Sequence, residues 1–158
     1  MGTIASYENV DFGFDRAVIT GGSYRPEVFV GPALTSNERE PISRAVPILQ
    51  GMRICTSGPL TGEQCSGIVT FVNDCYVFQG GAATCNVSAV FSQTTRLANF
   101  GDSGSPLIMY QDDETDSGPA FAMGMILGGG NDGTGREALF HETRMAIPPG
   151  WRLVPSNI

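Results

Sequence analysis

One glycine-rich segment, Phe100-Gly-Asp-Ser-Gly-Ser-Pro106, contains the residue types that could carry out a reaction. Gly101 and Gly104 flank Ser103, and glycine lets the backbone approach a substrate closely and adopt turn angles closed to other residues. Acyl transfer needs this geometry, because a hydroxyl must attack a carbonyl while backbone N–H groups receive the oxyanion. An ordinary glycine-rich turn between strands would have the same composition, so the segment alone leaves both interpretations open.

A serine nucleophile needs a general base, and the sequence offers a single histidine. His141 follows Ser103 by 38 residues (141 − 103), in a segment where we expect a surface or packed histidine. We therefore do not assign the base to His141.

Four cysteines stand at regular intervals, at positions 55, 65, 75 and 85. Four cysteines allow three disulfide pairings, and spacing alone does not choose among them. There is no Cys-x-x-Cys pair and the histidine lies far downstream, which argues against a zinc site. We expect no metal site and no cofactor. Disulfides indicate an oxidising compartment and thus a secreted protein. The N-terminus does not have the pattern of a signal peptide, so we expect that an upstream segment is missing.

The charge balance argues against two classes of partner. Nine basic and sixteen acidic residues give a formal charge of −7, and none of the basic residues is lysine. Binding to nucleic acid depends on clustered basic charge, so we expect no nucleic-acid partner. The longest apolar run, Ala120 to Leu127, is interrupted by Gly124 and too short to cross a membrane, so we expect no membrane partner.

The sequence predicts that the elements that position Ser103 are β-strands. Runs rich in Val, Ile, Phe and Thr alternate with turn residues at 28–30, 48–54, 67–72, 75–78, 87–91, 107–110 and 120–127. Turns are expected at 72–75 and 78–81, and a loop over 32–47. The best helical candidate, Glu137 to Ala146, is short and is followed by two prolines. This pattern predicts an all-β barrel or sandwich.

Four segments resemble the chymotrypsin-like serine endopeptidases. The first, Phe14-Asp-Arg-Ala-Val-Ile19, resembles the strand that carries the aspartate of the catalytic triad. Gly101-Asp-Ser-Gly-Ser-Pro-Leu107 is similar to the family's Gly-Asp-Ser-Gly-Gly-Pro signature, with Ser105 replacing the last glycine. The segment Cys55–Cys65 resembles the loop Cys-x-Ser-Gly-x-x-Thr-Gly-x-x-Cys of the streptogrisin and alpha-lytic branch. Gly124–Gly130 resembles the strand and glycines of the specificity pocket. In order along the chain, the resemblance extends from about Asp15 to Phe140.

The resemblance implies an all-β, chymotrypsin-like antiparallel β-barrel fold. Residues 45–158 would form the complete second barrel, with the nucleophile and the specificity pocket and at most a short C-terminal helix. Residues 1–44 would be the remnant of the first β-barrel and the linker between barrels. The missing N-terminal barrel segment of a parent chain would then be a partner of this one.

The resemblance also implies roles for individual residues. Ser103 would be the nucleophile of a serine endopeptidase, and the N–H groups of Gly101 and Ser103 would form its oxyanion hole. Asp15 would orient the general base; Asp11 is a rival for this role, less favoured because Asp15 is followed by an apolar strand. The base itself would lie in the missing segment, so we expect little activity from this chain.

Substrate preference and disulfide pairing follow from the same resemblance. The positions that would line the pocket carry no acidic residue, which favours an apolar side chain before the scissile bond of a peptide or protein substrate. These positions are Leu97 and Ala98 at the base and Leu127, Gly128 and Gly129 at the wall.

The implied disulfides are Cys55–Cys65 and Cys75–Cys85, the second bracketing a hairpin-like segment. The branch places an arginine after the first cysteine as the partner of the acid before the nucleophile. This sequence has none there, so Asp102 is expected to pair with Arg53 or Arg96.

Two other functions remain open. The first is a non-catalytic binding module on the protease fold, which an upstream histidine would argue against. The second is an esterase or lipase of the Gly-Asp-Ser type, which Gly101-Asp-Ser103, Gly130-Asn-Asp132 and His141 loosely resemble. In that family the serine block lies near the start of an α/β fold, whereas here it lies two thirds along a β-patterned chain.

Overall fold

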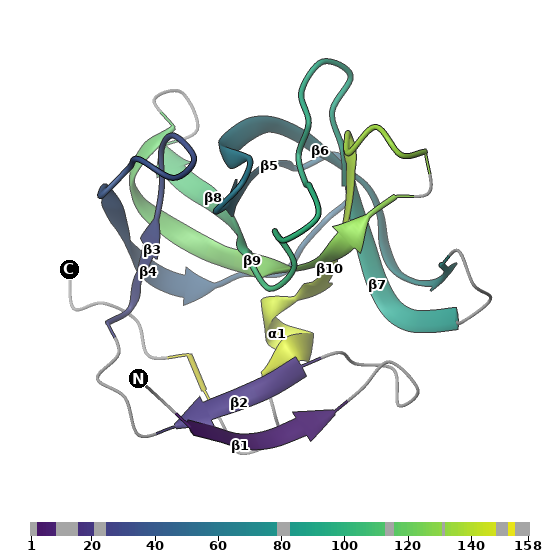
Figure 1. The fold of residues 1–158 in the computed structure, drawn as a ribbon, viewed down its shortest axis with the longest axis horizontal. Coiled ribbons are helices and arrows are strands. Elements are labelled where there is room, and N and C mark those ends of the chain that lie inside the picture. The colour runs from purple at the N-terminus through teal and green to yellow at the C-terminus, as the bar shows by residue number, and fades with distance from the viewer. Residues whose placement is uncertain are drawn as a thin grey trace.

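The computed structural model describes residues 25–78, 83–112, 116–130, 132–147 and 152–153, together with the backbone of two further strands. Those strands, β1 (Thr3–Glu8) and β2 (Arg16–Thr20), pair antiparallel as a separate two-stranded sheet beside the main body (Figure 1). In the described part of the chain no helix has the length and hydropathy needed to span a bilayer.

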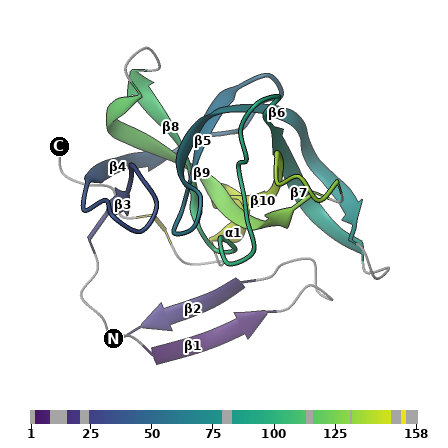
Figure 2. The ribbon, with the colours of Figure 1, turned by 45° about the horizontal axis from the view of Figure 1, so that its top comes forward.

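Six strands close into an antiparallel barrel, which confirms the predicted all-β fold (Figures 1 and 2). Around the ring, each strand is hydrogen-bonded to the next, and the pairing of β10 with β9 completes the circuit. In ring order the strands are β5 (Arg53–Gly58), β6 (Gly62–Val77), β7 (Ala83–Phe91), β10 (Glu137–Glu142), β9 (Ser117–Gly129) and β8 (Pro106–Asp112).

Two more strands extend the barrel sheet outward from β9. β4 (Arg39–Ala45) pairs parallel with β9, and β3 (Glu27–Phe29) pairs antiparallel with β4. The loop predicted over 32–47 is therefore wrong for its second half. Ile42 is the one buried residue of β4. The local sequence is therefore largely polar, although its backbone pairs with β9 and β3. The division into units 1–44 and 45–158 stays a prediction.

The barrel interior is filled by large apolar side chains from every strand of the ring. Four of these side chains are completely buried and belong to a single packed cluster: Leu97, Leu107, Met123 and Phe140. Each such side chain stabilises the fold by roughly 1.5–3 kcal/mol relative to exposure. A second cluster joins β3 and β4 to the outside of the barrel through Val28, Ile42 and Ile108, among others.

The turn predicted at 72–75 is wrong, because β6 runs through it. The register against β7 shifts on both sides of Asp74, and Asn73 has φ +54°, as expected for bulges that bend a long strand. Asn and Asp favour both turns and bulges, so the local sequence does not separate the two. Of the turn predicted at 78–81, residues 79–81 lie outside the described residues.

The helix predicted over 137–146 is also wrong for its first six residues. Glu137–Glu142 form β10, which pairs with β7 on one side and β9 on the other. Its last five residues are all buried, and a strand buried on both faces has no alternating pattern to identify it. Only α1 (Thr143–Ala146) is helical, consistent with the short C-terminal helix expected from the resemblance.

Candidate active site

Ser103 is exposed on a tight turn between the core residue Ala98 and strand β8. Gly101 and Gly104 have φ +97° and +83°, a region in which only glycine is unstrained. The turn is fastened to β9, because the N–H of Gly104 donates to the carbonyl of Ile126 at 2.7 Å. In return, the N–H of Ile126 donates to the carbonyl of Ser105 at 2.8 Å.

Two backbone N–H groups of this turn are left for a ligand. The N–H of Asp102 donates to the carbonyl of Asn99 at 3.0 Å, and that of Ser105 to the carbonyl of Asp102 at 3.0 Å. By contrast, the N–H groups of Gly101 and Ser103 donate to no other described residue. Gly101 and Ser103 are both exposed, so these two N–H groups are accessible to the oxygen atom of a bound carbonyl group.

The hydroxyl of Ser103 donates to the carbonyl of Leu127 in β9 at 3.0 Å. The single histidine of the sequence does not lie at this hydroxyl. His141 is 2% exposed in β10, and its Nδ1 donates to the carbonyl of Asn86 at 3.0 Å. Asp15 and its rival Asp11 lie outside the described residues.

Asp102, which precedes the serine, is completely buried, and backbone amides satisfy its carboxylate. Oδ1 accepts the N–H of Leu60 at 2.9 Å, and Oδ2 accepts the N–H of Asn99 at 2.8 Å. The expected pairing with Arg53 or Arg96 is wrong. Two amides already occupy both oxygens, so no cation is needed to hold the charge.

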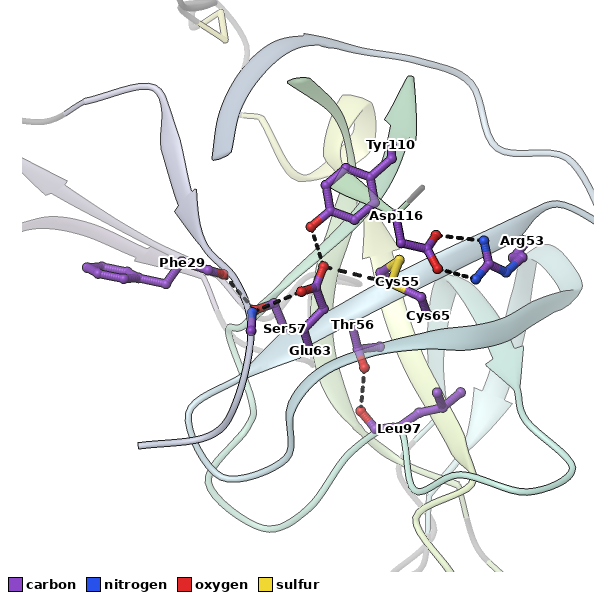
Figure 3. The surroundings of a disulfide bond; sticks show 11 residues. Phe29, Arg53, Cys55, Thr56, Ser57, Glu63, Cys65, Leu97, Tyr110 and Asp116 are labelled. Atoms are coloured by element: carbon purple, nitrogen blue, oxygen red, sulfur yellow. Dashed lines mark hydrogen bonds and ion pairs between the residues drawn. A yellow bond between two sulfur atoms is a disulfide. The ribbon is translucent and has the colours of Figure 1, made fainter. Parts of the chain in front are cut away.

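The two arginines are engaged elsewhere. Arg53 forms a bidentate ion pair with Asp116, with one contact at 2.7 Å (Figure 3). Arg96 donates from Nε to the carbonyl of Thr134 at 3.1 Å.

A cavity of about 480 Å³ opens beside Ser103. Its lining comes from the end of β6, the segment before Ser103, the end of β9 and the glycines that follow. The lining residues are Phe78, Arg96, Asn99, Phe100, Ser103, Leu127, Gly128, Gly129, Gly130, Gly133 and Gly135. The three wall positions expected from the resemblance, Leu127, Gly128 and Gly129, are thus brought together with Ser103.

The two positions expected at the pocket base do not line this cavity. Leu97 is completely buried and Ala98 is 2% exposed, and both belong to the barrel core. The Thr56 hydroxyl donates to the Leu97 carbonyl at 2.8 Å, which fixes the segment with this side chain inward (Figure 3). The assignment of Leu97 and Ala98 to the pocket is therefore corrected to the core.

Sequence reasoning missed the aromatic and cationic members of the lining. Phe78 follows β6 and packs edge to face on Tyr76, with 5.3 Å between ring centroids. The Cys75–Cys85 disulfide joins β6 to β7 three residues before Phe78, the one described residue between the two cysteines that lines the cavity. The position of Phe78 between the two bonded cysteines was the one sequence feature that could have placed it at the cavity. No local feature of the sequence placed Arg96 there.

Both predicted disulfides are present. Cys55–Cys65 joins β5 to β6, and Cys75–Cys85 joins β6 to β7. Beside the first, Glu63 accepts the N–H of Gly31 at 2.9 Å and the hydroxyl of Tyr110 (Figure 3). Burial, together with this carboxylate, raises the pKa of Tyr110, so the phenol stays a hydrogen-bond donor. These contacts hold the segment after β3 against the barrel.

A second cavity, of about 460 Å³, adjoins the residues that follow the Ser103 turn. Its lining is formed by residues 27–34 and 36, residues 57–59, Ser105 and Pro106. Two large apolar side chains in this part of the surface, Phe29 and Leu34, are 57% and 82% exposed.

Comparison with solved structures identifies the architecture. The chain is similar to Cellulomonas bogoriensis chymotrypsin, with a TM-score of 0.68 and 24% identity. The superposition covers 98% of this chain and 76% of that protein. The fold is that of the chymotrypsin-like bacterial serine proteases.

Two further structures give the same result. Thermobifida fusca protease A matches 98% of the chain and is 75% covered by it, with a TM-score of 0.71 and 20% identity. Alpha-lytic protease homolog N4 matches 89% and is 66% covered, with a TM-score of 0.61 and 19% identity. No protein-family model matches the sequence, and a search of curated proteins finds no match. The streptogrisin and alpha-lytic resemblance of the sequence is thus consistent with the three-dimensional comparison.

Proposed function

We propose that this chain is the nucleophile-bearing part of a serine endopeptidase, with Ser103 as the nucleophile. The observation that supports this most directly is the turn itself. The turn carries an exposed hydroxyl and two N–H groups, of Gly101 and Ser103, that donate to no described residue, and a cavity opens beside Ser103.

The proposed reaction proceeds through an acyl-enzyme. The Ser103 oxygen attacks the carbonyl carbon of the scissile peptide bond while its proton passes to a general base. The carbonyl oxygen becomes an oxyanion and accepts hydrogen bonds from the N–H groups of Gly101 and Ser103. The carbon–nitrogen bond then breaks, the amine leaves with the proton from the base, and water releases the acyl group from Ser103.

The general base comes, in this proposal, from a partner segment. His141 is buried in β10 and bound to the carbonyl of Asn86, so it is not placed to serve Ser103. A first-barrel segment bearing a histidine, oriented by Asp15, would complete the triad. The isolated chain is then expected to have little activity. Its two disulfides fit an oxidising, extracellular location.

The substrate class follows from the cavity walls. The apolar contacts with a substrate side chain, first expected from Leu97 and Ala98, would come instead from Phe78 and Leu127. No acidic side chain lines the cavity among the described residues, so a substrate Lys or Arg would lose its hydration without gaining a counter-charge. We therefore expect basic side chains to be rejected.

Of the alternatives, the Gly-Asp-Ser esterase does not fit the all-β barrel, because that family has an α/β fold. The non-catalytic binding module differs from the proposal only in the reactivity of Ser103.

Imidazole rescue separates the two possibilities. The chain is incubated with a p-nitrophenyl ester with and without added imidazole, which supplies an external base. We expect imidazole-dependent acylation at Ser103, located by mass spectrometry, and its loss in Ser103→Ala but not in the exposed control Ser117→Ala. Equal rates in the wild type and Ser103→Ala at every imidazole concentration would favour the binding module.

A further inference from the structure

Arg96 is the one ionisable side chain among the described residues that line the cavity beside Ser103. It comes from the segment before the Ser103 turn, directly ahead of the buried Leu97. The other walls are aromatic or aliphatic side chains and glycines, apart from Asn99 and Ser103. A positive charge therefore faces an otherwise largely apolar pocket.

The arginine is held in a defined position. Its Nε donates to the carbonyl of Thr134 at 3.1 Å, and its stem passes close to Gly135. A Cβ at Gly135 would lie 2.9 Å from Cγ of Arg96, and φ there is +71°, so only glycine permits the approach. The N–H groups of Leu97 and Ala98 both donate to the carbonyl of Gly135, at 2.7 and 3.1 Å, which locks the two segments together.

This anchoring leaves the far edge of the guanidinium available. Within the described ranges the bond from Nε to Thr134 is the guanidinium's only hydrogen bond, and no carboxylate lies within 4.0 Å of it. The two Nη nitrogens form a planar fork that matches the two oxygens of a carboxylate. An anchored fork loses less rotamer freedom on binding than a free arginine does.

Two acidic groups lie near the cavity without lining it. Asp132 is engaged by the N–H and hydroxyl of Thr134, which lower its pKa, at 3.0 and 2.6 Å. Glu137 lies behind Gly130, where a Cβ would overlap its carboxylate. Burial and the charge of Asp132 raise the pKa of Glu137, against a hydrogen bond from Tyr76. Neither acid forms an ion pair with Arg96 within the described residues.

We propose that Arg96 determines specificity, and that the pocket beside Ser103 accepts a glutamate side chain of the substrate, with its stem against Phe78 and Leu127 and its carboxylate on the guanidinium. This inference rests on the proposed peptidase function, since it names the side chain that would precede the scissile bond. A glutamate side chain can make apolar contacts with the walls and an ion pair with Arg96. Leucine or phenylalanine can make only the apolar contacts.

The test measures binding, so it does not depend on the reactivity of Ser103. Two acetylated tetrapeptide amides that differ only in their last residue, Glu or Gln, are titrated against the chain by isothermal calorimetry or NMR. Both ends are blocked, so the side chain carries the only charge that differs. We expect the Glu peptide to bind roughly five- to tenfold more tightly at low salt, and the difference to shrink as sodium chloride is raised.

The variants assign the preference to Arg96. Arg96→Gln is expected to bind the Glu and Gln peptides equally, and Arg96→Lys to retain part of the preference, because lysine keeps the charge without the fork. Arg25→Gln removes the same charge at an exposed position outside the cavity and should leave the preference unchanged. Equal binding of the two peptides by the wild type would overturn the proposal, as would no saturable binding of either or a preference that survives in Arg96→Gln.

Discussion

The carboxylate of Asp102 occupies the space over the α-carbon of Gly58: a Cβ at Gly58 would lie 2.4 Å from Oδ1 of Asp102. The loop closed by the Cys55–Cys65 disulfide and the Ser103 turn therefore meet at a position that admits no side chain. The N–H of Leu60, in the same loop, donates to that Oδ1. The geometry of the Ser103 turn is thus set in part by a residue far from it in the sequence.

Gly58→Ala is expected to displace Asp102 and weaken its bonds to Leu60 and Asn99. The free energy of unfolding should fall by about 1–3 kcal/mol, as for overpacked or newly unsatisfied buried groups. Urea denaturation measures this, with Gly128→Ala as the control, since nothing lies within 4 Å of a Cβ there. A variant as stable as the control would show that the turn does not depend on this contact.

Leu97→Ala distinguishes a core position from a pocket position. Because Leu97 is completely buried in the barrel, the substitution should lower the free energy of unfolding by about 2–5 kcal/mol. The ratio of Glu to Gln peptide affinity should stay at the wild-type value. Leu127→Ala is the matched comparison, with weaker binding of both peptides and a smaller loss of stability. A changed peptide ratio in Leu97→Ala would restore Leu97 to the pocket.

Removal of the Cys75–Cys85 disulfide, in Cys75→Ser/Cys85→Ser, should affect both stability and binding. A loop of this length is expected to contribute about 3 kcal/mol through the unfolded state. Peptide affinity should also fall, because the arm that carries Phe78 loses its clamp. Adding Phe78→Ala to this variant should then cost less affinity than Phe78→Ala costs in the wild type. Additive losses in calorimetric titrations would mean that the disulfide does not position Phe78.

Glu142 predicts a pH dependence of stability. The group is 6% exposed, and burial raises its pKa above the ordinary 4.5, against a hydrogen bond from Ser88 and the charge of Arg144. The folded state binds this proton more tightly than the unfolded state, so the group's contribution to stability is complete below pH 4.5 and is lost as pH rises.

Thermal melts of the wild type and Glu142→Gln between about pH 4 and 8 test this direction. Carboxyl groups of raised pKa titrate in about this range. Glutamine at position 142 does not ionise. The melting temperature of the variant minus that of the wild type should therefore rise with increasing pH. A difference that falls with pH would contradict the direction of the shift.

The sequence predicted the parts of the site that depend on local chemistry. The glycines around Ser103 are required by positive φ angles, and the disulfide pairing implied by the family resemblance joins neighbouring strands. Apolar runs in the sequence also identified most of the barrel strands, because each strand buries one or both of its faces.

What depends on contacts across the sheet could not be predicted in this way. Leu97 and Arg96 are neighbours in the sequence but face the core and the cavity, respectively, and the bonds to Thr56, Thr134 and Gly135 fix that division. Phe78 lines the cavity at the end of a strand whose register against β7 shifts three times, and the local sequence does not predict such shifts. The sequence of β10 does not identify it as a strand, because burial of nearly all its residues removes the alternation of a strand.

The parallel pairing of β4 with β9 has a consequence for how the molecule behaves at high concentration. β4 covers residues of β9 that would otherwise present unpaired backbone groups to other chains, and the sheet then stops at β3, three residues long. Arg39 stacks over the exposed ring of Phe29 at 4.8 Å and lies 3.8 Å from Glu27, so charge surrounds this last strand. A short, charged border is a poor template for edge-to-edge aggregation.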